Sequence, residues 1–279
     1  MQGRIVKQIS NDYTVFSDGK IYVCKSRGKF RNLKITPLVG DLVEFNPEDC
    51  YILNVLERKN ELIRPSVSNI DQVFIVTSVK RPDFSTVLLD KLLMVVEYHN
   101  IVPVLVFTKI DLLDKEELQE FEQYKKYYEK IGYSCFKNTE VDEIKKLFLE
   151  KITVFTGQSG AGKSTLLNKI DSRLHLETNE ISDALGRGKH TTRHTELLFI
   201  EDGWVADTPG FSSLSLQTMT PIEIRDNFVD FNLFRDECKY RDCMHDKEDN
   251  CIIKEKVDEG FLLKSRYENY LKFIHEEHK

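Results

Sequence analysis

The sequence predicts an α/β protein in three parts: a β-barrel over residues 1–67, a doubly wound α/β domain over 68–220, and a helical, metal-binding region over 221–279. Three observations predict this. Short β-rich segments fill the first part, buried apolar strands alternate with helices in the second, and cysteines gather in the third. A chain of 279 residues is also too long for one small core.

The first part is expected to contain short strands at residues 4–9, 13–16, 20–25, 41–45 and 51–56. Two dipeptides, Asp18-Gly19 and Gly40-Asp41, mark breaks between them. So many short strands in so short a stretch favour an OB-fold, with an SH3-like barrel as the structural alternative.

A basic stretch with Phe30 at its centre follows the third expected strand. Its cations are Lys25, Arg27, Lys29, Arg31 and Lys34. Residues 1–67 hold 11 Lys and Arg against 8 Asp and Glu, whereas the whole chain carries a net charge of −6. The imbalance favours contact with an RNA backbone, and an ordinary solvated loop is the alternative.

The second part alternates between strands and helices. Strands are expected at 72–79, 103–108 and 152–156, helices at 85–99, 115–131, 141–149 and 163–169, and a hairpin at 197–200 and 204–206. Nearly continuous apolar strands between amphipathic helices indicate a parallel sheet covered on both faces. The third part is expected to end in one charged helix over 254–278.

The segment after the strand at 152–156 matches the phosphate-binding pattern GxxxxGKS and opens a helix, which is the context that this motif requires. Glycines let backbone N–H groups turn onto phosphate oxygens. Lys163 would reach the β- and γ-phosphates, and the Ser164 hydroxyl would bind magnesium. The predicted nucleotide-binding residues here are Gly157, Gln158, Ser159, Gly160, Ala161, Gly162, Lys163, Ser164 and Thr165.

A second motif, Thr108-Lys109-Ile110-Asp111, closes a buried strand and indicates guanine. The Asp111 carboxylate can accept from both N1–H and the exocyclic amine of guanine, and adenine lacks this pair of donors. Lys109 would pack its stem along the base. Both residues follow a strand at the carboxyl edge, where such sheets bind ligands.

A third motif, Asp207-Thr-Pro-Gly210, follows the last expected strand. Asp207 would hold Mg²⁺ through water, and the Gly210 N–H would meet the γ-phosphate. Between the phosphate loop and this motif, the loop at 186–192 offers the hydroxyl of Thr191 or Thr192 to Mg²⁺. The guanine motif precedes the phosphate loop, so the order is circularly permuted relative to an ordinary small GTPase. A parallel sheet with surface termini tolerates such permutation.

Four metal-ligand side chains fall within fourteen positions of the third part. Three thiolates and one imidazole make a closed tetrahedral set for a structural zinc ion. The ligands would be Cys238, Cys243, His245 and Cys251.

No apolar run approaches the roughly 18 residues needed to cross a bilayer, and the N-terminus lacks the apolar core of a signal peptide. The net charge argues against a protein that coats nucleic acid along its length. We therefore expect a cytoplasmic monomer without a membrane partner.

These motifs, in this order, resemble the small ribosomal subunit biogenesis GTPase family, RsgA, also called YjeQ-like, over nearly the whole chain. The resemblance implies late action in small (30S) subunit maturation, with hydrolysis of GTP to GDP and phosphate stimulated by the subunit. It implies an OB-fold that contacts ribosomal RNA, one structural zinc ion, and Mg²⁺ with GTP or GDP. Thr108, Lys109 and Asp111 would read guanine, and residues 157–165 would hold the phosphates.

Two positions leave questions. Many GTPases place a water-orienting glutamine after the third motif, where this chain has the apolar Phe211, so His190, His194 or the ribosome would complete the site. Around residues 134–139 the chain lacks the Ser-Ala-like turn of the family, so the sequence does not identify the backbone N–H that meets guanine O6.

Two other functions compete with this one: a nucleotide-gated RNA-binding module and an ATP-dependent P-loop enzyme.

Overall fold

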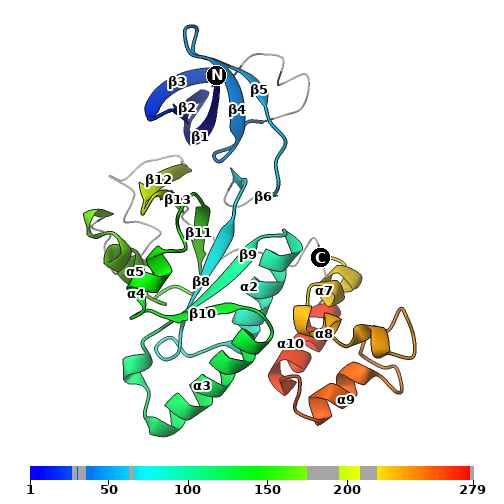
Figure 1. Cartoon of the computed structure of the whole chain (residues 1–279). Helices are drawn as coiled ribbons and strands as arrows, with labels where there is room; N and C mark the ends of the chain where they lie inside the picture. The colour runs from blue at the N-terminus through cyan, green and yellow to red at the C-terminus, as the bar shows by residue number, and fades with distance from the viewer. Residues whose placement is uncertain (27–29, 31–35, 63–65, 175–194, 208–218, 277–279) are drawn as a thin grey trace.

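The structure is a computed structural model that describes all residues except 27–29, 31–35, 63–65, 175–194, 208–218 and 277–279. Figure 1 shows a barrel above an α/β body, with a group of C-terminal helices packed beside the body. Among the described residues, no helix is both long and apolar enough to span a membrane.

The N-terminal part is a closed barrel of five strands: β1 (Gln2–Ile9), β2 (Asp12–Ser17), β3 (Lys20–Ser26), β4 (Leu42–Asn46) and β5 (Tyr51–Val55). The strands follow the order β1-β2-β3-β5-β4, and β4 returns to pair with β1. The contact between β3 and β5 is parallel, which fits the predicted OB-fold and not an all-antiparallel SH3-like meander. A small antiparallel pair, β6 (Glu61–Leu62) and β7 (Val67–Ser68), which the sequence did not predict, follows the barrel.

The body is a sheet in the order β10-β9-β8-β11-β13-β12. Its strands are β8 (Gln72–Ser78), β9 (Val102–Thr108), β10 (Ser134–Lys137), β11 (Ile152–Thr156), β12 (Glu196–Ile200) and β13 (Gly203–Asp207). All neighbours are parallel except β12 and β13, which form the predicted hairpin. The short edge strand β10 was missed, because four residues with two polar members carry almost no periodic signal.

Helices cover both faces of this sheet. On one face lie α2 (Thr86–Tyr98) and α3 (Lys115–Lys130), and on the other lie α4 (Val141–Lys145) and α5 (Lys163–Ile170). Alternate residues of the strands enter two apolar clusters: Ile75 of β8 packs on the first face and Phe74 on the second. This confirms the predicted doubly wound arrangement, although α4 is shorter than the helix expected at 141–149.

The C-terminal region contains α7 (Pro221–Asp226), α8 (Val229–Asn232), α9 (Ile252–Asp258) and α10 (Lys264–His275), with a short 3-10 turn at Arg235–Glu237. The prediction of one helix over 254–278 is wrong. Gly260 has a φ of 77°, in the left-handed region that ends helices, and the chain turns there before α10 begins.

The barrel is not separate from the body. Strand β1 pairs with β12, so the barrel strands and the body strands form one continuous eleven-stranded sheet. The sequence did not predict this junction.

Candidate functional site

The parallel strands of the body end at one edge of the sheet. Strands β8, β9, β11 and β13 end at Ser78, Thr108, Thr156 and Asp207. Beyond the strand ends, the Val79 N–H still donates to the Thr108 carbonyl at 3.1 Å. The segments that follow these strands therefore start side by side, where open parallel sheets bind ligands.

The segment at 157–164 turns tightly from β11 into α5. Gly157 has a φ of 135°, and a Cβ on it would lie 1.9 Å from the Val76 carbonyl oxygen, so only glycine fits. Gly162, with a φ of 94°, caps the N-terminus of α5. Backbone N–H groups in the first turn of a helix have no intrahelical partner, and together they attract an anion. The local geometry is therefore suited to binding phosphate.

Lys163 begins α5 and turns back over this loop. Its ammonium group donates to the carbonyls of Gly157 and Gln158, both at 2.8 Å. Burial lowers the pKa of Lys163 to about 8, because the charged form loses water. A bound phosphate group would supply a negative charge beside this half-buried ammonium group. Its neighbour Ser164 is buried in the same turn, at 4% exposure.

The guanine motif touches the phosphate loop directly. The Thr108 hydroxyl, 2% exposed, donates to the Ala161 carbonyl at 2.5 Å. The Lys109 ammonium donates to the Gly160 carbonyl at 2.7 Å and to the Arg81 carbonyl. Asp111 lies on the 3-10 turn Ile110–Leu112 and is exposed to solvent. Two motifs separated by almost fifty residues in sequence thus meet in one place.

Two further segments lie at this edge: the sequence reasoning missed the first, and the second belongs to the stretch 134–139, whose role it left open. The turn after β8 brings Arg81 and Pro82 beside the phosphate loop, where the Pro82 ring lies 3.8 Å from a Cβ built on Gly160. On the other side, the Asn138 N–H donates to the Phe107 carbonyl at 2.9 Å, and Lys169 of α5 donates to the Asn138 carbonyl at 3.5 Å. The end of β8 was a usable signal for the first segment, because each of the other parallel strands expected from the sequence ended in a motif.

The predicted magnesium-facing residues are only partly described. Asp207 is the last residue of β13, opposite Glu196 of β12. Thr191, Thr192 and Gly210 lie outside the described residues, as do His190, His194 and Phe211. Of the remaining predicted loop residues, Ala161 is buried, Gln158 and Gly162 are half-buried, and Ser159, Gly160 and Thr165 are exposed.

The four predicted metal ligands come together in the C-terminal region. The candidate ligand atoms of Cys238, Cys243, His245 and Cys251 all lie within 4.8 Å of one another. His245 Nδ1 is 3.6 Å from Cys238 Sγ and 3.3 Å from Cys251 Sγ. A tetrahedral zinc ion with sulfur bonds of about 2.3 Å requires ligand atoms roughly 3.5–3.8 Å apart. The cluster therefore has the size of a zinc site.

Burial sets the protonation of this cluster. It lowers the pKa of His245 to about 4, so the imidazole is neutral and Nδ1 can act as a ligand. It raises the pKa of the Cys243 thiol to about 12, because a thiolate alone is unfavourable in this environment. A divalent cation would stabilise the thiolates, which is the electrostatic requirement of a structural metal site.

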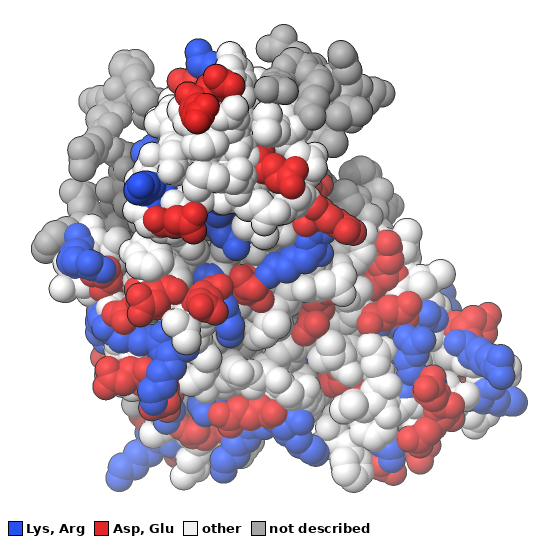
Figure 2. Space-filling model, turned by 45° about the horizontal axis from the view of Figure 1, so that its top comes forward, with Lys and Arg blue, Asp and Glu red and all other residues white. Residues whose placement is uncertain are grey.

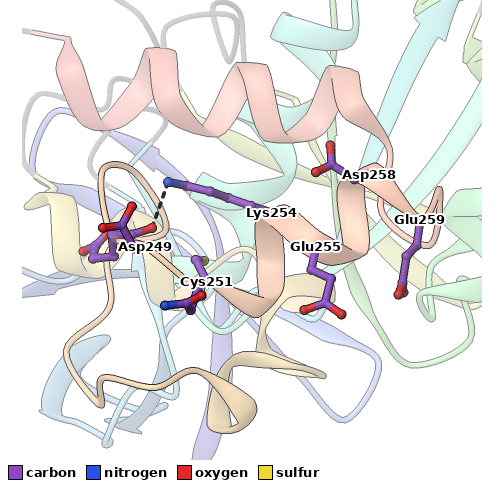
Figure 3. Close-up of a pocket in the computed structure, with 8 residues that line it drawn as sticks. Asp249, Cys251, Lys254, Glu255, Asp258 and Glu259 are labelled. Atoms are coloured by element: carbon purple, nitrogen blue, oxygen red, sulfur yellow. Dashed lines mark hydrogen bonds between the residues drawn. The ribbon is translucent and has the colours of Figure 1, made fainter.

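A separate hollow of about 440 Å³ lies beside Cys251, and Figure 3 shows its lining. Five of the eight lining side chains are carboxylates, and the only lysine, Lys254, donates to the Glu248 carbonyl at 3.0 Å. The five are Glu248, Asp249, Glu255, Asp258 and Glu259. Such a lining repels phosphate, so this hollow is not a nucleotide site.

The predicted RNA-contacting stretch is also only partly described. Arg27, Lys29, Arg31 and Lys34 lie outside the described residues, Lys25 is exposed, and Phe30 is buried in the barrel core at 3% exposure. On the face shown in Figure 2, acidic and basic side chains are interleaved over the described surface. No broad field of one sign is visible on the described part of that face.

Comparisons with known proteins agree in sequence and in fold. A family model described as RsgA GTPase matches residues 55–217, and one described as RsgA N-terminal domain matches residues 2–51. Small ribosomal subunit biogenesis GTPase RsgA 2 of Oceanobacillus iheyensis is 50% identical over 283 residues, covering 99% of this chain and 97% of that protein. The RsgA of Enterococcus faecalis is 49% identical over 282 residues, covering 99% and 95%.

Two solved structures are similar over their whole length. YjeQ from Thermotoga maritima gives a TM-score of 0.86 at 36% identity, covering 99% of this chain and 97% of that chain. YloQ, described as a circularly permuted GTPase, gives 0.83 at 38% identity, covering 99% and 94%. The likeness therefore includes the barrel, the body and the C-terminal helices.

Proposed function

Because this chain belongs to the RsgA family of small ribosomal subunit biogenesis GTPases and is a GTP hydrolase, we propose a specific division of roles among its residues. Residues 157–165 bind the phosphates of GTP, with Lys163 as the cation that compensates charge developing on the γ-phosphate. Thr108, Lys109 and Asp111 form the guanine side of the site. One observation carries this assignment: Thr108 and Lys109 bond directly to the loop at Gly160 and Ala161.

Magnesium would be held by the Ser164 hydroxyl, by Asp207, and by Thr191 or Thr192, and it would neutralise charge on the β- and γ-oxygens. The half-buried Lys163 and the glycine-rich backbone provide the rest of the phosphate environment. The Gly210 N–H would meet the γ-phosphate. Phe211 cannot orient the attacking water, because its side chain has no polar atom.

The other two regions serve docking. The parts at 1–67 and 221–279 flank the GTPase part at 68–220, and we assign the barrel to contact with ribosomal RNA. The C-terminal cluster holds one structural zinc ion through Cys238, Cys243, His245 and Cys251. We place the protein in the cytoplasm as a monomer, where its six cysteines, all unpaired, remain reduced.

The decisive experiment is GTP turnover of the full chain with and without purified small ribosomal subunits. We expect slow intrinsic turnover and acceleration by the subunits, because Phe211 leaves the water without an orienting group. In the same assay, unlabelled GTP and ATP are compared as competitors of labelled GTP. Inhibition by GTP alone excludes an ATP-dependent enzyme. Equal rates with and without subunits would instead favour the nucleotide-gated RNA-binding module, whose hydrolysis is incidental.

Removal of zinc is expected to weaken subunit docking much more than GTP binding. The metal would hold the short turns between α8 and α9, which bury few apolar side chains of their own. The measurements are zinc content by elemental analysis, subunit co-sedimentation, and binding of a fluorescent GTP analogue, before and after chelation. Cys251→Ser should reproduce the effect, and Cys135→Ser, outside the cluster, should keep one zinc ion per chain. Unchanged docking after verified zinc loss would contradict a structural role.

A further inference from the structure

The barrel meets the body at the end of the sheet that carries the proposed magnesium site. Strands β1 and β12 pair antiparallel with Lys7 opposite Glu196. Strands β12 and β13 pair antiparallel with Glu196 opposite Asp207. Lys7, Glu196 and Asp207 therefore lie in line across three neighbouring strands. Figure 1 shows β12 and β13 directly below β1 and β2.

The contact between Lys7 and Glu196 also involves their side chains. The Lys7 ammonium lies 2.7 Å from Glu196 Oε2, and the two side chains are 33% and 36% exposed. A second contact supports the junction: the Phe16 ring of β2 meets the Trp204 ring of β13 edge-on, with centroids 5.2 Å apart. The barrel thus holds both strands of the hairpin that ends in Asp207.

Loss of the ion pair between Lys7 and Glu196 affects the position of β12 more than the stability of the protein. A half-exposed ion pair contributes about 0–1 kcal/mol, so its loss does not unfold a domain. Asp207, in contrast, must stand within a fraction of an ångström of its working position to hold a water on Mg²⁺. Because Glu196 is its direct neighbour across the ladder, any slip of β12 changes the backbone position of Asp207.

We propose that Lys7 is a positioning residue for GTP hydrolysis: through Glu196 it fixes the start of β12 against β13 and thereby sets the position of Asp207. This inference rests on the proposed role of Asp207 as the magnesium-associated aspartate. It gives the barrel a part in the reaction besides docking, because the ion pair links the barrel to the strand next to Asp207.

The test is intrinsic GTP turnover of the full chain, measured as a function of Mg²⁺ concentration. Lys7→Met should raise the half-saturating Mg²⁺ concentration by up to about fivefold, because a pair that contributes at most about 1 kcal/mol can shift binding by no more than that. The thermal midpoint should stay close to that of the wild type. In the presence of Glu196→Gln, Lys7→Met should cause no further increase, because Lys7 acts only through Glu196.

The chain offers a closely matched control at the other end of the same hairpin. Lys145 and Glu201 form an ion pair at 2.7 Å with side-chain exposures of 32% and 36%, but Glu201 lies at the turn between β12 and β13. Lys145→Met should leave the Mg²⁺ dependence unchanged. If Lys7→Met and Lys145→Met behave alike, or if Lys7→Met changes the Mg²⁺ dependence equally in the presence of Glu196→Gln, the positioning role is wrong.

Asp207→Asn separates failure of this inference from failure of the proposed function. If it weakens the response to Mg²⁺ while Lys7→Met does not, only the positioning role is lost. If Asp207→Asn has no effect on that response, the assignment of Asp207 itself fails and the positioning inference fails with it.

Discussion

Replacing Lys163 with methionine is expected to reduce GTP turnover by about 10²- to 10³-fold, the range seen when one preorganised donor to a developing charge is removed. The side chain already turns over the loop, where it donates to the Gly157 and Gln158 carbonyls. Methionine keeps the length of the stem but supplies neither charge nor donor. Single-turnover hydrolysis at saturating GTP measures the chemical step apart from binding.

The same substitution should not destabilise the protein in the absence of nucleotide. Burial lowers the pKa of Lys163 to about 8, so between pH 8 and its ordinary value the folded state binds fewer protons than the unfolded state. At pH 7 the buried ammonium is held at a cost, which methionine removes. The thermal midpoint should therefore be equal to or above that of the wild type. Lys146→Met, an exposed lysine after α4, serves as the control; normal turnover by Lys163→Met would refute the phosphate-loop assignment.

Replacing Arg266 with alanine is expected to lower the free energy of unfolding by about 3–5 kcal/mol, the cost of leaving buried charges without their partner. Arg266 of α10 is 2% exposed and bonds to Asp90 of α2 at 2.6 Å and to Asp230 of α8 at 2.6 and 2.8 Å. Burial alone would lower the pKa of Arg266, but the two aspartates raise it well above its ordinary value. Urea denaturation followed by circular dichroism measures the loss.

The surrounding hydrogen bonds complete this network. Tyr128 donates to Asp90 at 2.8 Å, Tyr127 donates to Asp230 at 2.6 Å, and Asn269 donates to Asp90 at 2.7 Å. Alanine at 266 would leave both carboxylates buried with these neutral donors only. The network fixes the C-terminal helices against α2 and α3, on one face of the GTPase sheet.

Two variants test the explanation for this loss. A triple variant, Arg266→Met with Asp90→Asn and Asp230→Asn, removes all three charges and should lose less stability than Arg266→Ala. Arg235 forms an ion pair with Asp226, and the two side chains are 38% and 40% exposed. Arg235→Met should therefore change the free energy of unfolding by less than about 1 kcal/mol. If Arg266→Ala lowers the free energy of unfolding by less than about 1 kcal/mol, the buried network does not hold the C-terminal region in place.

Several features of the fold could be predicted because their signals are local. The strands around Phe74, Val104 and Val154 are continuous apolar runs, and the barrel strands alternate between buried and exposed residues. Reliance on local signals also explains why a single C-terminal helix was predicted wrongly. The charged pattern of residues 254–278 is helical in composition, but Gly260 adopts the left-handed conformation that divides it into α9 and α10.

The sequence by itself determined that this protein is a GTPase, and it predicted the cluster of three cysteines and one histidine that the structure brings together. The phosphate loop, the guanine motif and the cysteine cluster are each nearly contiguous, so residue type and spacing define their chemistry before any packing is known. Only the tertiary structure decided how the parts are joined. Lys7 and Glu196 are 189 residues apart, and Arg266 and Asp90 are 176 apart. In sequence each of these four residues looks like ordinary solvated charge, because pairing between distant residues depends on which faces of the fold come into contact.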